Sequence, residues 1–310
     1  MAEKLKVVFA GTPDFAVPSL ERLLEDSEIE VVAVFTQPDR PAGRGQELSA
    51  PPVKKVAEEK GIPLFQPEKL EASELQKFSP DFLVVVAYGV ILADDVLSLP
   101  KFGCINLHAS LLPKFRGASP IQSAILSSED KTGVSFMRIT EKLDSGPVYT
   151  QFKVEIAEKN AEELGTELAA LGGEKFPEVL KMLAAGELKE TPQDDAQASE
   201  CKKIEKADGK VNWEKDSAET LLKKLRAFTP WPGVWTEIGG KNLKLVDFET
   251  WNVEHETQKD GETFERAGKI GVQSADGAIQ LIKVQLEGKK ALDVQEFVKG
   301  NADFVGAKLG

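Results

Sequence analysis

Residues 82–87, Phe82-Leu83-Val84-Val85-Val86-Ala87, are the stretch that decides the fold. The stretch has no polar side chain, and half of its residues are the β-branched valine. Such a composition is typical of a strand inside a parallel sheet, where both faces are covered and the alternation of apolar and polar residues disappears. The stretch therefore predicts a buried parallel strand with helices on both faces of its sheet.

The segments before this strand alternate between apolar runs and helical patterns. Residues 5–10 and 29–35 are apolar runs, and between them apolar residues recur with helical spacing over 15–25. Strands that alternate with helices predict a doubly wound α/β sheet. Ligands of such sheets bind beyond the carboxyl ends of the strands, so the residues that follow each strand are the first candidates for a functional site.

The last third of the chain has a different pattern, and a polar stretch precedes it. A helical period over 161–185 is interrupted by Gly172-Gly173, and residues 187–206 have no apolar period. We interpret 187–206 as a linker between a first domain over 1–186 and a second over 207–310. Short apolar segments alternate with glycine turns in the second domain, at 234–238, 243–248, 269–273 and 278–284. This pattern predicts a small β-barrel.

Charge and hydropathy limit the classes of function. The net charge is −12, all of it from residues 1–200, because residues 201–310 carry equal numbers of acidic and basic side chains. An acidic protein is not the usual nucleic-acid binder, so any contact with nucleic acid must use local basic patches. No apolar run approaches the roughly 20 residues that span a bilayer, so we expect no membrane association.

Cysteine and histidine are scarce in this chain. Cys104 and Cys201 are the two cysteines, and His108 and His255 are the two histidines. These residues have no metal-ligand spacing, so we expect no metal site. Two distant cysteines suit a reducing compartment, which predicts a cytoplasmic protein.

The strongest chemical motif lies where the next apolar run ends. Residues 103–107 are predicted as a strand, and residues i and i+2 of a strand point to the same face. The carboxamide of Asn106 and the imidazole of His108 therefore project side by side, and Asp144 on a later turn can supply a carboxylate. Acyl transfer to an amine requires an amide to hold an oxyanion, a base to accept a proton and an acid to orient that base. Asn106, His108 and Asp144 are thus the predicted catalytic residues.

Two loops supply candidates for binding. The turn Ser110-Leu111-Leu112-Pro113 places apolar residues beside polar groups, which favours a pocket wall. The loop over 37–45 carries Arg40 and Arg44. These arginines, like Lys203 in the linker, are either solvated surface charge or contacts to a phosphate backbone.

Together these motifs resemble the methionyl-tRNA formyltransferase family, and the resemblance covers nearly the whole chain. The core CINLHASLLPKFRGASPIQSAI is shared with folate-dependent formyltransferases in general. DRPAGRG and PWPG are more specific to the tRNA enzymes. The other segments that carry the resemblance are FAGTPDFAVPSLERLL, VVVAYGVIL, TGVSFMRITEKLDSGPV and VQLEGKKALDVQEFVKG.

The resemblance implies an activity and a domain plan. Members transfer a formyl group from 10-formyltetrahydrofolate to the methionine amino group of initiator methionyl-tRNA, for translation initiation. They carry a Rossmann-like formyltransferase domain followed by an OB-like C-terminal domain that binds tRNA. The implied partners are initiator methionyl-tRNA and the folate donor, with no metal, and we expect a monomer.

The resemblance also assigns roles to residues. The family's catalytic set corresponds to Asn106, His108 and Asp144, and its folate-contacting turn to residues 110–113, which are Ser110, Leu111, Leu112 and Pro113. Its tRNA contacts correspond to Arg40, Arg44 and Lys203. The segment before Lys203, Ser199-Glu200-Cys201-Lys202, lacks the tyrosine that is usual in the family.

Two other functions fit parts of the pattern. A sugar-nucleotide formyltransferase has the same core and also a barrel domain, but the DRPAGRG loop and the PWPG segment argue against it. A catalytically silent module that binds tRNA or folate would not need a base, so the intact Asn106, His108 and Asp144 argue against that alternative.

Overall fold

The computed structural model of the chain describes residues 3–42, 47–251 and 258–310, and these form two compact units. Unit 1 comprises the chain up to Pro120 together with Asp130–Glu155 and Glu163–Lys202. Unit 2 comprises Ile121–Glu129, Ile156–Glu162 and Lys203–Gly310. Within the described ranges, no helix combines the length and the apolar character that crossing a bilayer requires.

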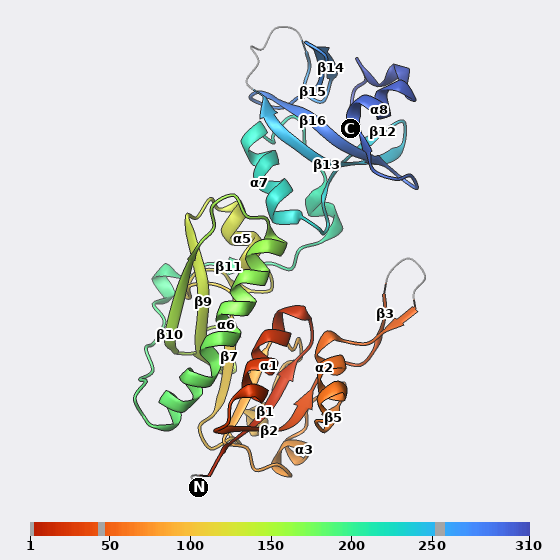
Figure 1. The fold of residues 1–310 in the computed structure, drawn as a ribbon. Helices are drawn as coiled ribbons and strands as arrows, with labels where there is room; N and C mark the ends of the chain where they lie inside the picture. Colours follow the sequence, from red (N-terminus) through yellow and green to blue (C-terminus); the bar gives the residue numbers. More distant parts are fainter. Residues whose placement is uncertain (1–2, 43–46, 252–257) are drawn as a thin grey trace. The chain divides into compact units, whose positions relative to one another are not determined.

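A seven-stranded sheet organises unit 1 (Figure 1), in the order β10-β9-β7-β6-β1-β2-β5. Its strands are β1 (Leu5–Gly11), β2 (Ile29–Phe35), β5 (Leu64–Phe65), β6 (Phe82–Val86), β7 (Cys104–His108), β9 (Lys131–Arg138) and β10 (Val148–Glu155). The five neighbouring strands β5, β2, β1, β6 and β7 are parallel to one another. Strands β9 and β10 extend the sheet beyond β7, and each is antiparallel to its neighbours. The strand order reverses direction at β1, with β2 on one side and β6 on the other, which confirms the predicted doubly wound fold. All five side chains of β6 are buried, as its composition predicts.

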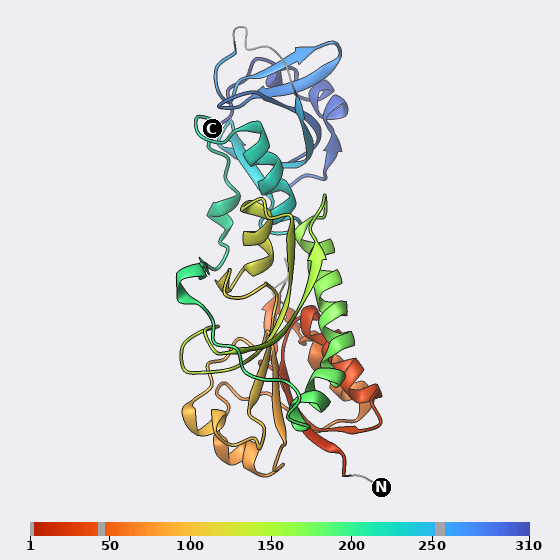
Figure 2. The same cartoon turned by 90° about the vertical axis from the view of Figure 1, so that its left-hand side faces the viewer.

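Helices cover both faces of this sheet (Figure 2). Helices α1 (Val17–Glu25), α2 (Pro52–Lys60) and α6 (Ala161–Ala184) lie on one face, and α3 (Ala72–Gln76) and α4 (Asp94–Leu97) lie on the other. On the second face, Leu75 of α3 and Val96 of α4 belong to one buried cluster with Val8 and Leu83 of the sheet. Burial on both faces explains why the central strands contain almost no polar residues.

Helix α6 runs without a break through Gly172 and Gly173, so the predicted interruption is wrong. A Cβ atom on Gly172 would lie 2.3 Å from Cδ2 of Leu107, and one on Gly173 would lie 2.7 Å from the backbone of Pro18. The two glycines therefore serve close packing of the helix against β7 and α1 rather than ending the helix.

The loop over 37–45 and the residues directly after it contribute two strands that were not predicted. Strands β3 (Arg40–Ala42) and β4 (Glu47–Ser49) form a separate antiparallel pair, in which Arg40 lies opposite Ser49. Arg44 falls outside the residues that the structure describes.

The stretch interpreted as a linker lies against unit 1 for most of its length. Thr191 forms a bridge with Val148 of β10, and β11 (Glu200–Cys201) pairs in parallel with β8 (Arg116–Gly117). The last segment of unit 1 ends at Lys202, and the main segment of unit 2 begins at Lys203.

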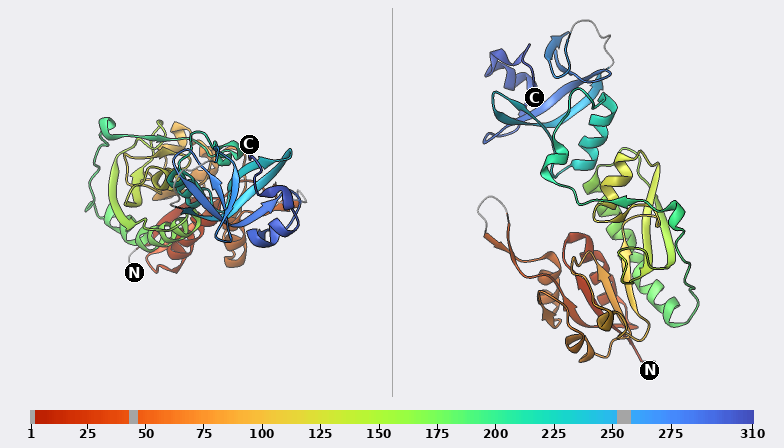
Figure 3. Two further views of the ribbon diagram at one scale, coloured as in Figure 1. Left: turned by 90° about the horizontal axis from the view of Figure 1, so that it is seen from above. Right: turned by 180° about the vertical axis from the view of Figure 1, so that it is seen from behind.

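Unit 2 is built on an antiparallel sheet (Figure 3), in the order β12-β13-β16-β15-β14, with β17 paired to β16. Its strands are β12 (Val234–Ile238), β13 (Lys241–Trp251), β14 (Thr263–Arg266), β15 (Lys269–Gln273), β16 (Ala278–Leu286) and β17 (Leu292–Asp293). Helix α7 (Ala218–Phe228) contributes Leu221 to the buried core of this unit, and helix α8 (Val294–Lys299) contributes Phe297. The predicted second domain of short strands is confirmed, although β14, β17 and α8 were not predicted.

Candidate active site

Strand β7 carries the first two predicted catalytic residues at its carboxyl end. Asn106 pairs with Val85 of β6 on one side and with Met137 of β9 on the other. Hydrogen bonding on both sides fixes the strand, and the two-residue spacing directs Asn106 and His108 to one face of it. The Asn106 side chain is half-buried, and no hydrogen bond joins it to another residue of the described ranges. Its amide is therefore available to donate to a ligand.

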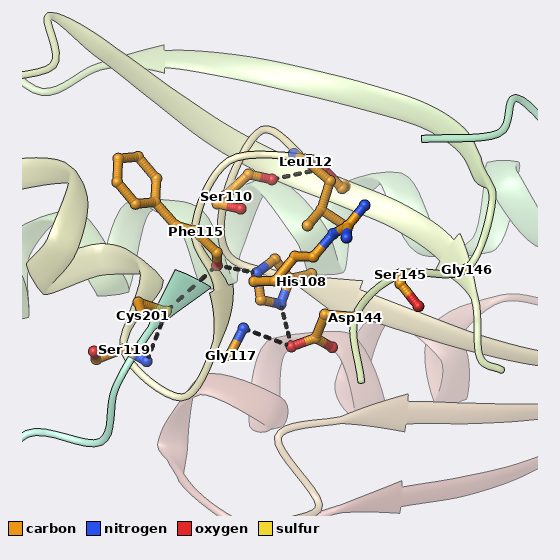
Figure 4. A network of polar contacts seen from close by, with 12 residues as sticks. His108, Ser110, Leu112, Phe115, Gly117, Ser119, Asp144, Ser145, Gly146 and Cys201 are labelled. Carbon is orange, nitrogen blue, oxygen red and sulfur yellow. Dashed lines mark hydrogen bonds and ion pairs between the residues drawn. The ribbon is translucent and has the colours of Figure 1, made fainter. Parts of the chain in front are cut away.

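The imidazole of His108 lies between a carbonyl and a carboxylate (Figure 4). Its Nε2 is 2.9 Å from the carbonyl oxygen of Phe115, and its Nδ1 is 3.7 Å from Oδ2 of Asp144. A carbonyl can only accept, so Nε2 carries a hydrogen and Nδ1 is the nitrogen left for proton chemistry. The side chain is 6% exposed, so bulk water has little access to the ring.

Asp144 reaches His108 from the turn between β9 and β10. Its Oδ2 accepts a hydrogen bond of 2.9 Å from the backbone N–H of Gly117. The backbone at Asp144 has a φ of +47°, a left-handed conformation that is uncommon for residues other than glycine. The structure thus brings together the predicted imidazole and carboxylate, which are 36 residues apart in the sequence.

The turn over 110–113 is held from the neighbouring strands. Oγ of Ser135 donates to the carbonyl of Ser110 at 2.6 Å and accepts from the backbone N–H of Leu112 at 3.1 Å. Gln151 on β10 donates to the carbonyl of Leu112 at 2.9 Å. Ser110 and Leu112 are buried, so their side chains pack inward, whereas Leu111 and Pro113 are half-buried. Leu111 and Pro113 therefore offer the surface of this turn that a ligand could touch.

Of the residues predicted to bind tRNA, Arg40 and Lys203 are exposed, and Arg44 lies outside the described residues. Arg40 lies on β3 in unit 1, and Lys203 begins the main segment of unit 2.

Sequence reasoning missed a cavity of about 490 Å³ in unit 1. Its walls come from α4 and from the segment that leads from β9 to Asp144, namely Asp94, Leu97, Ser98, Arg138, Ile139, Thr140, Glu141 and Lys142. Among these residues Leu97 and Ile139 are apolar, and Ile139 packs against the buried cluster of the α3 and α4 face. The one feature of the sequence that could have indicated this cavity is the position of its lining segment directly before Asp144.

Cys104 is two residues before Asn106 on β7, but it is not a candidate nucleophile. Its Sγ lies 3.6 Å from the carbonyl of Leu97, and burial raises the pKa of the thiol to about 12. A thiol with this pKa remains protonated at neutral pH and is a poor nucleophile.

Comparison with known proteins identifies the family of the chain. Residues 4–180 match the family model described as formyl transferase, and residues 203–302 match that of the formyl transferase C-terminal domain. A methionyl-tRNA formyltransferase of Geobacter metallireducens is 42% identical over 313 residues, which cover 99% of each chain. One from Myxococcus xanthus is 44% identical over 308 residues, covering 96% of this chain and 95% of the relative.

A solved structure shares the fold at low sequence identity. HypX from Aquifex aeolicus, in complex with tetrahydrofolic acid, matches 98% of this chain and 48% of its own length, with a TM-score of 0.65 and 19% identity. The family models cover most of the chain, and the relatives match its full length at more than 40% identity. The chain therefore belongs to the methionyl-tRNA formyltransferase family.

Proposed function

We propose that this protein transfers a formyl group from 10-formyltetrahydrofolate to the methionine amino group of initiator methionyl-tRNA, for translation initiation. The observation that carries the proposal is the grouping of Asn106, His108 and Asp144 at the carboxyl edge of a doubly wound sheet. This grouping provides an amide donor, an imidazole and a carboxylate for acyl transfer to an amine. The family to which the chain belongs supplies the identity of the acceptor.

The folate donor fits the surroundings of Asp144. The cavity of about 490 Å³ is lined in part by Lys142, two residues before Asp144, and its apolar residues Leu97 and Ile139 stand beside polar ones such as Ser98 and Thr140. A flat heterocycle with polar edges suits a site of this kind. We assign the folate head group to this cavity and contacts with the rest of the donor to the turn of Ser110, Leu111, Leu112 and Pro113, mainly through Leu111 and Pro113.

In the proposed reaction the methionine nitrogen attacks the formyl carbon, and a tetrahedral intermediate with a negatively charged oxygen forms. The free amide of Asn106 donates to that oxygen, and the interaction strengthens as charge develops. The new C–N bond to methionine is retained while the bond between the formyl carbon and N10 of the folate breaks. The amine nitrogen loses a proton and N10 gains one, so tetrahydrofolate and formylmethionyl-tRNA are the products.

The geometry of His108 specifies which ring nitrogen takes part. Because the carbonyl of Phe115 accepts from Nε2, the proton leaving the amine is taken up at Nδ1. Nδ1 faces the Asp144 carboxylate across 3.7 Å, so the negative charge of Asp144 stabilises the imidazolium that results. Deep burial of the ring strengthens this interaction, because little water screens it.

The remaining assignments concern the acceptor. We propose that Arg40, Arg44 and Lys203 contact phosphates of the tRNA, that residues 1–186 provide the chemistry, and that residues 207–310 bind tRNA beyond the 187–206 segment. Exposed side chains suit this role for Arg40 and Lys203, since phosphate contacts form at the surface. We further propose that the protein acts as a monomer in the cytoplasm.

A transfer assay with three acceptors tests the function. The purified protein and 10-formyltetrahydrofolate are incubated with initiator methionyl-tRNA, elongator methionyl-tRNA or an amino-sugar nucleotide. Formylation of the initiator alone supports the proposal. Formylation of the sugar nucleotide would leave the assignment of the catalytic residues in place and contradict the assignment of the acceptor. Absence of product with all three acceptors would favour a catalytically silent binding module.

A further inference from the structure

We propose that Gln193 is a positioning residue that fixes the turn of Asp144, so that a segment beyond α6 helps to build the active site. The inference deepens the proposed function and rests on the catalytic role given there to Asp144. Gln193 lies in the polar stretch after α6, 49 residues from Asp144 in the sequence, where no motif marks it.

Gln193 holds the Asp144 turn by two hydrogen bonds. Its Nε2 donates to the carbonyl of Asp144 at 2.9 Å and to the carbonyl of Gly146 at 2.7 Å. These two acceptors flank Ser145, so one side-chain amide spans the whole bend. The bend needs such support because Asp144 has a φ of +47°, a conformation that residues with a side chain seldom adopt without external contacts.

The other end of Gln193 is held by Arg116. Its Oε1 accepts a hydrogen bond of 2.9 Å from Nε of Arg116. This donor and the two carbonyls together fix which end of the amide is oxygen and which is nitrogen, because a carbonyl only accepts and a guanidinium only donates. Gln193 thus has a defined orientation in which both of its polar atoms are used.

Arg116 connects this amide with the groups that hold the catalytic pair. The carbonyl of its predecessor Phe115 accepts from His108, and the N–H of its successor Gly117 donates to Asp144. The Arg116 side chain is 8% exposed, its Nη1 pairs with Asp195 at 2.8 Å, and its buried Nη2 has no partner among the described residues. Gln193 and Asp195 therefore hold a buried cation that sits between the two backbone contacts of the catalytic pair.

The arrangement predicts an effect on the chemical step. Loss of the two donated bonds frees the Asp144 turn, and the carboxylate moves relative to Nδ1 of His108. A displacement of about 1 Å in a catalytic group can lower the rate by up to about 100-fold. The substrate contacts proposed above do not include Gln193, so the KM values should change little.

The test uses Gln193→Glu, which keeps an oxygen for Arg116 but removes both donors to the turn. The matched control is Gln197→Glu, the same substitution on the same segment, where the glutamine is exposed and donates to Asp194 instead. We expect kcat to fall by about 10- to 100-fold for Gln193→Glu and to stay within about 2-fold for the control. Equal kcat values for the two variants would overturn the inference. If Gln193→Glu does not fold, Gln193→Met, which has a similar volume and no donor, replaces it.

A double variant separates positioning from a general structural role. If Gln193 acts through the Asp144 carboxylate, then Gln193→Glu causes no further loss of kcat once Asp144→Asn is present. Losses that multiply in the double variant would overturn the inference. Near-normal turnover of Asp144→Asn alone would instead overturn the proposed catalytic site. An inactive Asp144→Asn beside a fully active Gln193→Glu would overturn only the role of Gln193.

A spectroscopic measurement gives a readout that does not depend on activity. The chain has two histidines, so imidazole ¹⁵N spectra contain signals from His108 and His255 alone, and a His255→Asn variant assigns them. Gln193→Glu should change the ring shifts of His108, because the Asp144 carboxylate facing Nδ1 moves, whereas Gln197→Glu should not. Unchanged His108 shifts in folded Gln193→Glu would contradict the inference.

Discussion

The turn that follows His108 and the hairpin that carries Arg40 are both loops of unit 1, but they are held in different ways. The turn accepts hydrogen bonds from Oγ of Ser135, from Nε2 of Gln151 and from the backbone N–H of Ser199, and these donors lie on three different segments. The hairpin of β3 and β4 pairs with itself, and contacts at its base tie it to the unit. Groups that react must be fixed before the substrate arrives, whereas an exposed arm that contacts a large partner needs accessible charge more than fixed geometry.

The base of the hairpin is nevertheless well defined. Asp39 pairs with Lys54 at 2.9 Å and accepts a hydrogen bond of 2.8 Å from Gln66. Gln37 donates to the carbonyl of Tyr88 at 2.8 Å, at the carboxyl end of β6. Changes in the turn and on β7 should therefore have large effects on catalysis, and changes in the hairpin should have smaller effects on tRNA binding.

The largest effect should come from Asn106→Ala. The variant loses the amide donor to the oxyanion, so kcat should fall by about 10²- to 10³-fold. The measurement is steady-state formylation of initiator methionyl-tRNA, with circular dichroism to verify folding. A folded variant with near-normal turnover would remove Asn106 from the mechanism.

Gly172→Ala and Gly173→Ala should separate a catalytic effect from an effect on stability, because the adjacent glycines contact different parts of unit 1. The new Cβ of Gly172→Ala meets Leu107, which stands between Asn106 and His108 on β7, so kcat should fall by about 10-fold. The new Cβ of Gly173→Ala meets the backbone of Pro18 on α1. That variant should lose about 1–3 kcal/mol of unfolding free energy through overpacking while kcat is retained. Urea unfolding and kcat are measured for both variants. A loss of kcat in Gly173→Ala but not in Gly172→Ala would contradict the role given to Leu107.

Arg40→Ala should affect the acceptor and not the donor. We expect the KM for tRNA to rise by about 5-fold and the slope of log affinity against log salt to fall by about 1, because one phosphate contact is lost. The KM for 10-formyltetrahydrofolate should stay unchanged. Identical salt dependence in the variant and the parent would exclude a phosphate contact at Arg40.

Asp39→Asn should have the smallest effect, a rise of about 2-fold or less in the KM for tRNA, since partly exposed ion pairs contribute little.

Hydrogen bonds from Gln66 and Lys54, together with the charge of Lys54, lower the pKa of Asp39 below its ordinary value of 3.8. Its contribution to stability is therefore present above pH 3.8 and is lost as the pH falls through the lowered pKa. The free energies of unfolding of the parent and of Asp39→Asn should therefore converge as the pH is lowered. A difference that grows in acid would contradict the lowered pKa of Asp39.

Local sequence determined much of the fold and part of the site. Apolar β-branched runs such as residues 82–87 predict parallel strands, because only strands buried on both faces are continuously apolar. The i and i+2 spacing of Asn106 and His108 is likewise a local property that places both side chains on one face.

Other features depend on contacts between distant segments. Gln193 lies in a polar stretch without period, and its role follows only from its contacts with Asp144 and Arg116. Gly172 suggests a helix break by propensity, but packing against Leu107 decides its place inside α6. The hairpin at Arg40 was missed because its strands are short and lie in a segment rich in proline and glycine.

The pairing of β11 with β8 limits how this protein can be recombined with its relatives. The two family models leave residues 181–202 unmatched, and a designer of chimeras would naturally treat them as a neutral joint. A junction placed directly after α6 would import another protein's residues at the positions of Gln193 and Ser199, which hold Asp144 and Phe115. The exchange point that preserves these contacts lies after Lys202. The first domain of a chimera should therefore keep the parent's residues from the end of α6 to Lys202.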